Sequence, residues 1–171
     1  NVGSTRCGKG LLLWGEPGHG KTTLAVSIIQ EMMLTFPLEP FKVEPGRSLI
    51  RPCYFSTFND ILSLKGSIIG GVATEDDKAL YDGMLGTCED DAYNIRVLIV
   101  DDLGKEHSSL SGWQSSEFHH LLRTRFNNGL PTIVTTNIKL EHWASTYGDA
   151  TESFANEAFI YLPIAMQDLR K

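Results

Sequence analysis

The sequence has few cysteines and no long apolar segment, and both absences narrow the classes of protein to consider. Its three cysteines, Cys7, Cys53 and Cys88, lie far apart and lack the close spacing of metal ligands. An odd, scattered set is typical of reduced thiols in a cytosolic protein, where we interpret them as small core residues. No run of about 18 apolar residues occurs, so we expect neither a transmembrane helix nor a membrane partner.

The sequence also lacks a dense cluster of basic residues. Its formal net charge is −6, which argues against a basic module that coats nucleic acid, although a local basic patch remains compatible with it. Lys42, Arg47 and Arg51 are loosely spaced, and we interpret them as solvated charges. Trp113 and Trp143 could stack on nucleic-acid bases, but we expect both to be packed in the interior.

The first ten residues, NVGSTRCGKG, contain neither an initiating Met nor the apolar core of a signal peptide. We therefore expect a domain cut from a longer chain, and the scattered cysteines lead us to expect a cytoplasmic protein. The 171 residues suffice for one domain with a sizeable core but not for two comfortable ones. We predict one domain over residues 1–171.

Short apolar runs alternate with segments of helical periodicity along most of the chain. The runs predict strands at 10–15, 52–56, 96–101, 131–137 and 158–163. The spacing of Leu24, Ile28 and Met32 predicts a helix that ends before Pro37. Further helices are predicted after the possible N-cap Thr57, around Asp76–Leu85, before Asn128-Gly129 and over LEHWASTYG. Alternation of this kind predicts a parallel sheet of five strands with helices on both faces, an α/β fold.

The segment GEPGHGKT, residues 15–22, matches Gly-x-x-x-x-Gly-Lys-Ser/Thr between a predicted strand and a predicted helix. Its glycines permit backbone conformations and close approach that a Cβ would hinder. The turn directs backbone N–H groups at phosphate oxygens, and the helix N-terminus adds positive partial charge. We predict that Lys21 reaches the β- and γ-phosphates and that Thr22 ligates Mg²⁺. The predicted nucleotide-binding residues here are Gly15, Glu16, Pro17, Gly18, His19, Gly20, Lys21, Thr22 and Thr23. The alternative is a Gly-rich turn that binds nothing.

The segment VLIVDD, residues 97–102, places two acids directly after an apolar strand. Adjacent carboxylates repel each other unless a cation or a proton-transfer task keeps them together. We predict that Asp101 holds the metal and that Asp102 positions and deprotonates the attacking water. Asn137 ends the strand PTIVTTN, where ligands of open α/β sheets bind, so its amide could hold that water. Its alternative role is to form a turn or cap a helix. Lys21, Asp102 and Asn137 are thus the predicted catalytic residues, with Thr22 and Asp101 as metal ligands.

The segments GEPGHGKTT, VLIVDDLGKE and LLRTRFNNGLPTIVTTN, in this order, resemble the AAA+ ATPases of the DnaC/DnaI helicase-loader group and their relative IstB, which assists a transposase. The likeness covers about Gly10 to Arg170. It implies a P-loop NTPase fold with the AAA+ ASCE core, an ATPase activity, the cofactors ATP and Mg²⁺, and Walker A, Walker B and sensor 1 roles for the residues assigned above. It also implies a sensor 2 role for Arg170, which would reach the γ-phosphate of its own subunit.

The resemblance further implies partners. These would be a replicative helicase or a transposase, and DNA, which we expect to be single-stranded. A nucleotide-dependent homo-oligomer, a ring or spiral, would engage the DNA. A segment that grips the protein partner would precede residue 1.

One feature departs from the group. Its members usually carry an arginine after sensor 1 that completes the neighbouring subunit's site, whereas this sequence has Phe154 close to that position and no arginine between Phe126 and Leu169. Loss of such an arginine finger can slow hydrolysis by about 10³–10⁵-fold. Three explanations are open: Arg123 or Arg125 substitutes, a partner supplies the group, or the protein is a slow ATPase that acts as a switch. We favour the last two, because we interpret Arg123 and Arg125 as ion-pair residues on a helix surface.

We therefore predict an ATP-dependent loader of a DNA-replication helicase, in the manner of DnaC. The first alternative is a transposition ATPase like IstB. The second is a nucleotide-gated adaptor with negligible turnover, which the missing arginine favours and the intact acidic pair opposes. A small-molecule kinase would need an arginine-rich lid for its acceptor, and we see none in this sequence.

Overall fold

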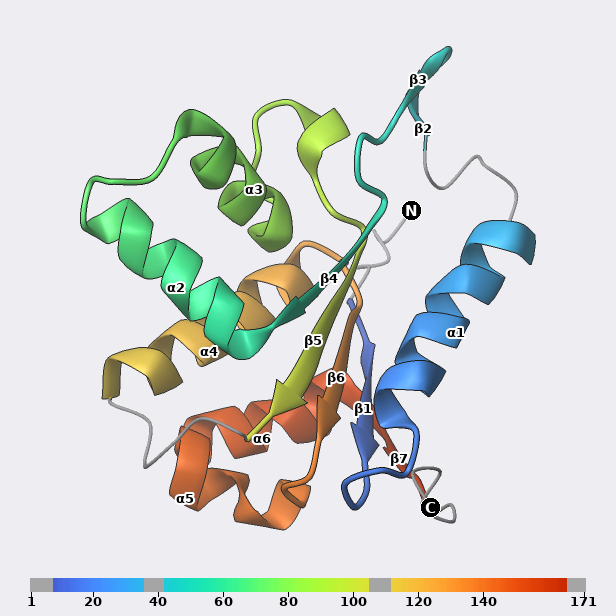
Figure 1. Cartoon of the computed structure of the whole chain (residues 1–171), viewed down its shortest axis with the longest axis vertical. Coiled ribbons are helices and arrows are strands. Elements are labelled where there is room, and N and C mark those ends of the chain that lie inside the picture. Colours follow the sequence, from blue (N-terminus) through green and yellow to red (C-terminus); the bar gives the residue numbers. More distant parts are fainter. Residues whose placement is uncertain (1–7, 36–41, 105–111, 166–171) are drawn as a thin grey trace, which may run out of the picture.

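A parallel sheet of five strands lies at the centre of the computed structural model, which describes residues 8–35, 42–104 and 112–165 (Figure 1). The strands, in spatial order, are β4 (Cys53–Thr57), β5 (Val97–Leu103), β6 (Thr132–Thr136), β1 (Gly10–Trp14) and β7 (Phe159–Pro163). Every pairing between them is parallel. The predicted five-stranded parallel sheet is therefore confirmed. A separate antiparallel pair, β2 (Lys42–Glu44) and β3 (Arg47–Ser48), was not predicted.

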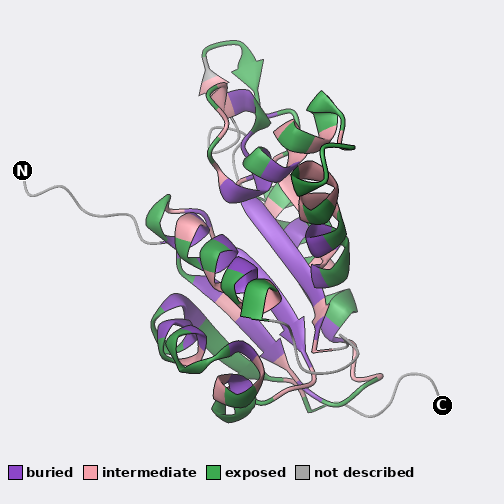
Figure 2. Cartoon of the chain, turned by 90° about the vertical axis from the view of Figure 1, so that its left-hand side faces the viewer, coloured by how far each residue is buried: buried purple, intermediate pink, exposed green. Residues whose placement is uncertain are grey.

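Helices lie on both faces of the sheet (Figures 1 and 2). On one face α1 (Lys21–Thr35) packs against alternate strand residues that include Leu13, Ile99 and Ile133. The other face carries α2 (Phe58–Ile69), α3 (Glu75–Leu85), α4 (Gly112–Asn127), α5 (Trp143–Tyr147) and α6 (Asp149–Ala158). Two short 3-10 helices, η2 (Asp91–Tyr93) and η3 (Leu140–His142), complete the described elements. Successive strand side chains point to opposite faces, so the part of β5 that is covered on both sides, Val97–Val100, is apolar.

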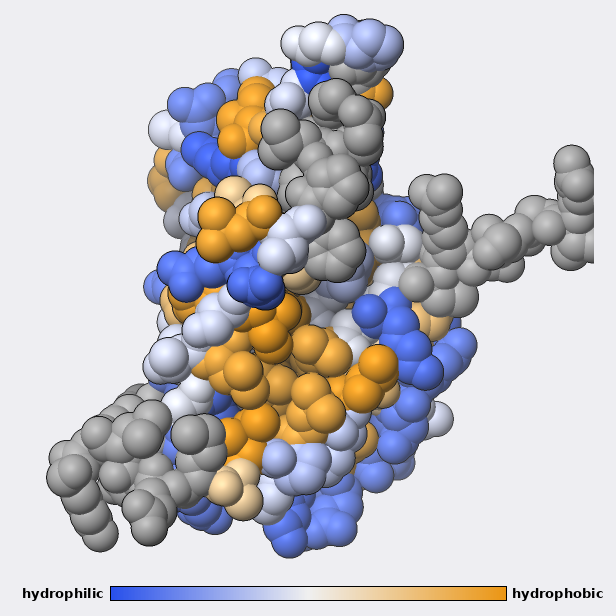
Figure 3. All heavy atoms as spheres, turned by 90° about the vertical axis from the view of Figure 1, so that its right-hand side faces the viewer, coloured by the Kyte–Doolittle hydropathy of each residue, from blue (hydrophilic) through white to orange (hydrophobic). Residues whose placement is uncertain are grey.

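The face that carries α1 is only partly covered, since α1 is the one helix of the described residues that packs there. Leu11 and Leu13 pair in register with Ile160 and Leu162, which places both residues of the outer strand on this face. These two residues and Leu24 are exposed by 51%, 37% and 37%, in that order. Figure 3 shows the broad apolar area on this side of the molecule. Among the described helices, none combines the length and hydropathy needed to cross a membrane.

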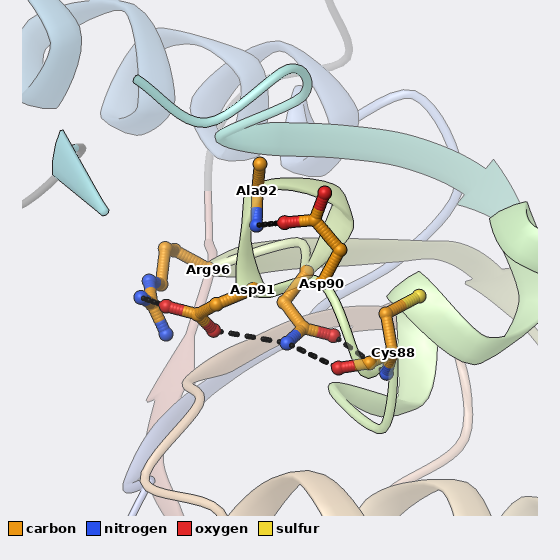
Figure 4. A network of polar contacts seen from close by, with 6 residues as sticks. Cys88, Asp90, Asp91, Ala92 and Arg96 are labelled. Carbon is orange, nitrogen blue, oxygen red and sulfur yellow. Dashed lines mark hydrogen bonds and ion pairs between the residues drawn. The ribbon is translucent and has the colours of Figure 1, made fainter. Parts of the chain in front are cut away.

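A polar network fixes the loop between α3 and β5 (Figure 4). The Asn94 Oδ1 atom accepts a hydrogen bond from the backbone N–H of Cys88 at 3.0 Å, and its Nδ2 donates to Asp91 at 2.9 Å. Arg96 donates to the same carboxylate at 2.7 Å. The Asn94 hydrogen bond, aided by the Arg96 charge, lowers the pKa of Asp91. The network therefore holds the start of β5, whose far end carries the predicted acidic pair.

Arg125 is fully buried, so its interpretation as a surface ion-pair residue is wrong. Its guanidinium donates to Thr132 Oγ1 at 2.9 Å and to the main-chain oxygens of Met84 (2.5 Å), Ile95 (3.1 Å), Arg96 (3.1 Å) and Pro131 (2.9 Å). Burial lowers the pKa of Arg125 to about 9. The oxygen acceptors stabilise the charged form, so we expect a protonated side chain at neutral pH. Arg125 joins the end of α3, the entry to β5 and the start of β6, and it cannot reach a neighbouring subunit.

The segment where an arginine finger was expected forms α6, a helix that we did not predict. Phe154 of this helix is 5% exposed and meets the Phe126 ring edge-on, with centroids 5.3 Å apart. The guanidinium of the exposed Arg123 lies 4.8 Å from the centroid of the Phe154 ring. Arg123 is thus on the surface, as interpreted, but its contact is with an aromatic ring.

The two tryptophans considered for base stacking differ in burial. Trp143 is fully buried, as expected. Trp113 is 43% exposed, so the expectation of interior packing is wrong for this residue. The reason is its position in the first turn of α4, ahead of Glu117, the first buried residue of that helix.

Candidate nucleotide-binding site

The predicted site residues that the structure describes meet at the carboxyl ends of β1, β5 and β6 (Figure 1). The strand β6 lies between the other two and is parallel to both. The loop after β1, the acidic pair of β5 and Asn137 therefore share one edge of the sheet, where open α/β folds bind ligands. Arg170 lies outside the described residues.

The loop from Gly15 to Thr22 has the glycine geometry that its pattern predicts. Gly18 and Gly20 have positive φ angles of 85° and 77°, which glycine adopts without steric cost. A Cβ atom at Gly15 would lie 2.4 Å from the main-chain oxygen of Ile164, so a larger residue would displace the backbone. Exposed positions are Glu16, Pro17, Thr22 and Thr23, and half-buried ones are Gly18, His19 and Gly20.

Lys21 connects this loop to the end of β6. Its side chain is buried, and Nζ donates hydrogen bonds to the main-chain oxygens of Gly15 at 2.7 Å and Glu16 at 2.9 Å. A third hydrogen bond, 2.6 Å long, reaches Asn137 Oδ1. Two residues predicted to be catalytic are therefore in direct contact, although 116 positions separate them in the chain.

Thr22, at the start of α1, is hydrogen-bonded to Asp101, in β5. The Thr22 hydroxyl donates to the Asp101 carboxylate, at 2.9 Å from Oδ1 and 3.1 Å from Oδ2. Hydroxyl and carboxylate oxygens are the ligands that Mg²⁺ prefers, usually together with substrate phosphates. The described residues contain no group of three or more His, Cys, Asp or Glu side chains able to hold a metal. The oxygen atoms of Thr22 and Asp101 fit the chemistry of a Mg²⁺ ion that also binds substrate phosphates.

Asp102 occupies a β-bulge rather than the end of the strand. The strand was predicted to end at residue 101, but β5 continues to Leu103 and shifts register against β6 between Val100 and Leu103. Asp102 is half-buried and has a φ of 56°, in the left-handed region that few non-glycine residues adopt. Bulges beside active sites often redirect a side chain. Here the bulge gives the second acid a backbone conformation that differs from that of a regular strand.

Comparisons with known proteins agree with this geometry. Residues 72–156 match the family of the IstB-like ATP binding protein. The crystal structure of the DnaC helicase loader has 29% identity and a TM-score of 0.66, and the match covers 96% of this chain and 82% of that chain. The likeness predicted from the motifs is confirmed. This chain is similar to the DnaC, DnaI and IstB group of AAA+ proteins.

More distant members of this comparison share the fold. The crystal structure of DnaI has 23% identity and a TM-score of 0.64, covering 92% of this chain and 73% of that chain. Domain III of the replication initiation protein DnaA from Thermotoga maritima has 18% identity and a TM-score of 0.62, covering 95% of this chain and 56% of that chain. The DnaC match confirms the predicted P-loop AAA+ fold, and these two structures share its arrangement. No curated protein sequence matches this chain significantly.

One residue at this edge of the sheet, Thr135, was not predicted to belong to the site. Thr135 is fully buried in β6, and its hydroxyl contacts both members of the acidic pair. The sequence shows Thr135 and Thr136 directly before Asn137, and this pair could have suggested a role in the site. Threonine is common in β-strands, however, and Thr135 reaches the bulge only through the pairing of β6 with β5.

Proposed function

We propose that this chain binds ATP with Mg²⁺ and acts as a loader of a DNA-replication helicase. The observation that carries the nucleotide proposal is that two neighbouring residues at the end of the phosphate-binding loop each contact another strand end: Lys21 contacts Asn137, and Thr22 contacts Asp101. These residues come from separate parts of the chain, yet they meet where a P-loop protein holds the phosphates and the metal.

Each side chain has a role that follows from its position. The Lys21 ammonium lies among oxygen atoms, and phosphate oxygens are acceptors of the same kind. Thr22 and Asp101 supply oxygen ligands for a cation. Bound ATP with Mg²⁺ would supply the phosphoryl group and the positive charge that offsets the two acids. The loop residues Gly15–Thr23 would contribute backbone N–H groups and shape, and Arg170 stays a predicted sensor 2 residue.

Asp102 and Asn137 are proposed to handle the attacking water. Asp102 is half-buried at the edge of the sheet, and its carboxylate is proposed to accept a proton as a general base. Asn137 accepts the Lys21 hydrogen bond through Oδ1, and an amide offers its Nδ2 atom as a separate donor. The hydrogen bond from Lys21 therefore fixes the orientation of the Asn137 amide.

The loader role is supported by the DnaC comparison, at 29% identity over 96% of this chain. A helicase loader would have a replicative helicase as partner, would contact DNA and would act as an oligomer. Arg47 is ion-paired with Asp90, so its charge is partly neutralised. We therefore propose that DNA is bound by weak basic regions of several subunits together, and not by one strongly basic surface of a single subunit. Phosphate contacts would then have to be contributed by several subunits.

The second candidate is an ATPase that assists DNA transposition. It is favoured by the match of residues 72–156 to the IstB-like family. A nucleotide-gated adaptor with little turnover is favoured by a different observation, the burial of Arg125, which removes one of the two substitutes for the arginine finger. In both cases the nucleotide site is the same, and the partner decides the function.

Steady-state ATP hydrolysis tests the proposal. We expect turnover that single-stranded DNA or a replicative helicase stimulates, and we expect Asp102→Asn to abolish turnover while it preserves ATP binding. Asp149→Asn, which removes an exposed acid at the start of α6, is the matched control. Binding without turnover under every condition would favour the adaptor. Stimulation by a transposase but not by a helicase would reject the loader role.

A further inference from the structure

Thr135 joins the two adjacent acids through one hydroxyl group. We propose that Thr135 is a positioning residue, which sets the orientation of the Asp101 carboxylate and stabilises the bulge that directs Asp102. The proposal rests on the proposed function, because it assigns Thr135 to the cation-binding part of the same site.

The bulge creates the need for such a residue. Between the register pairs Val100↔Val134 and Leu103↔Thr136, β5 advances by three residues while β6 advances by two. The extra residue interrupts the regular ladder of main-chain hydrogen bonds. The backbone N–H of Asp102 instead donates to the Thr135 hydroxyl oxygen at 2.9 Å. A side chain of β6 therefore replaces a main-chain partner at the point where the φ of Asp102 is positive.

The Thr135 hydroxyl donates its one hydrogen atom to Asp101, the first of the two acids. Thr135 Oγ1 donates to Asp101 Oδ1 at 2.6 Å. The Thr22 hydroxyl donates to the same oxygen at 2.9 Å, so the carboxylate is held from the strand side and from the helix side. Thr135 is fully buried, so water has no access to replace its hydroxyl without structural change. Its hydrogen bonds therefore couple the direction of the metal-ligand carboxylate to that of the proposed general base.

The neighbouring threonine has a different task. Thr136 Oγ1 donates to the main-chain oxygen of Leu103 at 2.8 Å and accepts from the N–H of Ile138 at 3.0 Å. It fixes the strand end beyond the bulge but contacts neither acid in these hydrogen bonds. The positioning of the carboxylate is thus assigned to Thr135 alone of these two adjacent residues.

Removal of the hydroxyl at constant shape tests the assignment. In Thr135→Val the Asp101 carboxylate and the Asp102 amide each lose a partner, and Thr135→Ser restores both. We expect Thr135→Val to raise the Mg²⁺ concentration needed for half-maximal binding of a fluorescent ATP analogue by about tenfold or more, as for loss of a buried hydrogen bond to a charged group. Nucleotide affinity without Mg²⁺ should stay unchanged. Thr135→Ser should return the Mg²⁺ dependence to near the wild-type value.

Thr151→Val is the matched control. Thr151 is also a buried threonine, but it lies on α6, where its hydroxyl contacts His119. This variant should lose comparable stability without any shift in Mg²⁺ dependence. A shift of equal size in both valine variants, or in neither, would overturn the proposal.

Amide exchange at Asp102 provides a readout that needs no nucleotide. We expect this N–H to be protected from exchange in the wild type and in Thr135→Ser, and to exchange faster in Thr135→Val. If the wild type binds no nucleotide, the proposed function fails, and the exchange data still decide whether Thr135 holds the bulge. Fast exchange of the Asp102 amide in the wild type would overturn the positioning role, whether or not the valine variant folds.

Discussion

Replacement of Arg125 by leucine should remove much of the stability of this fold. The substitution deletes a guanidinium that donates to five oxygen atoms and is fully buried. A buried acceptor left without a donor costs about 1–3 kcal/mol. The main-chain oxygen of Pro131 also accepts a hydrogen bond from the N–H of Leu98 at 3.4 Å, so it keeps a donor and four acceptors remain to be counted. Even the low end of this range gives a loss of about 4 kcal/mol for these four, against a net stability of about 5–15 kcal/mol for a typical domain.

Urea unfolding, followed by tryptophan fluorescence and by circular dichroism, would measure the loss. Arg123→Leu on the same helix is the matched control, because this arginine is exposed and its guanidinium lies over the Phe154 ring. Such a cation–π contact contributes about 0.5–1 kcal/mol at an exposed site. Arg125→Lys should fall between the two, because a lysine has a charge but only three donors and no planar fork. A loss for Arg125→Leu no larger than that for Arg123→Leu would refute the reasoning.

Three further predictions concern stability. Gly66→Ala should stabilise the protein by about 0.5–1 kcal/mol, because Gly66 lies inside α2 and no atom lies within 4 Å of the added Cβ; a lower urea midpoint would contradict this. Thr57→Ala should cost about 1 kcal/mol, since Thr57 caps α2 by accepting a hydrogen bond from Asp60 N at 3.2 Å; an unchanged midpoint would reject the cap's contribution. Burial, followed by the charges of Arg123 and His120, lowers the pKa of His119 below its ordinary value of 6.5. The unfolded chain then binds a proton at His119 more readily than the folded chain, so the free energy of unfolding should fall as the pH drops below about 6.5. Urea unfolding at about pH 5 and pH 7.5 should show a smaller difference in stability between the two pH values for His119→Gln than for the wild type.

Features set by neighbouring residues could be predicted from the sequence. The glycine pattern of residues 15–22 sits between a strand and a helix, and the apolar runs mark all the strands of the central sheet. Thr57 caps α2 as expected, because capping depends on residues within one turn. The AAA+ α/β fold followed from these local signals taken together.

Features that depend on contacts between distant segments of the chain could not be predicted from the sequence. The acceptors of Arg125 lie on α3, before β5 and at the start of β6, so helical spacing alone placed this residue on the surface. The bulge at Asp102 depends on the register between β5 and β6. The contact between Lys21 and Asn137 likewise exists only once β1 and β6 are neighbours.

The helix α6 is a different case, because its signal was present in the sequence. Its buried residues are Thr151, Phe154, Ala155 and Ala158, at the spacing of one helix face. Three of them are small or polar, so the apolar periodicity was weak. We interpreted Phe154 only as the residue close to the position of an expected arginine, whereas it is a core residue of α6.

Equilibrium binding of ATP tests the central claim most directly. Titration calorimetry with Mg²⁺ would compare the wild type with Lys21→Ala and with Lys139→Ala, which removes an exposed lysine just after Asn137. The account predicts one ATP site in the wild type and in Lys139→Ala, and a loss of affinity of about tenfold or more in Lys21→Ala, as for a charged hydrogen-bond donor. Equal affinity in all three folded proteins, or no binding to the wild type, would contradict a nucleotide site at this edge of the sheet.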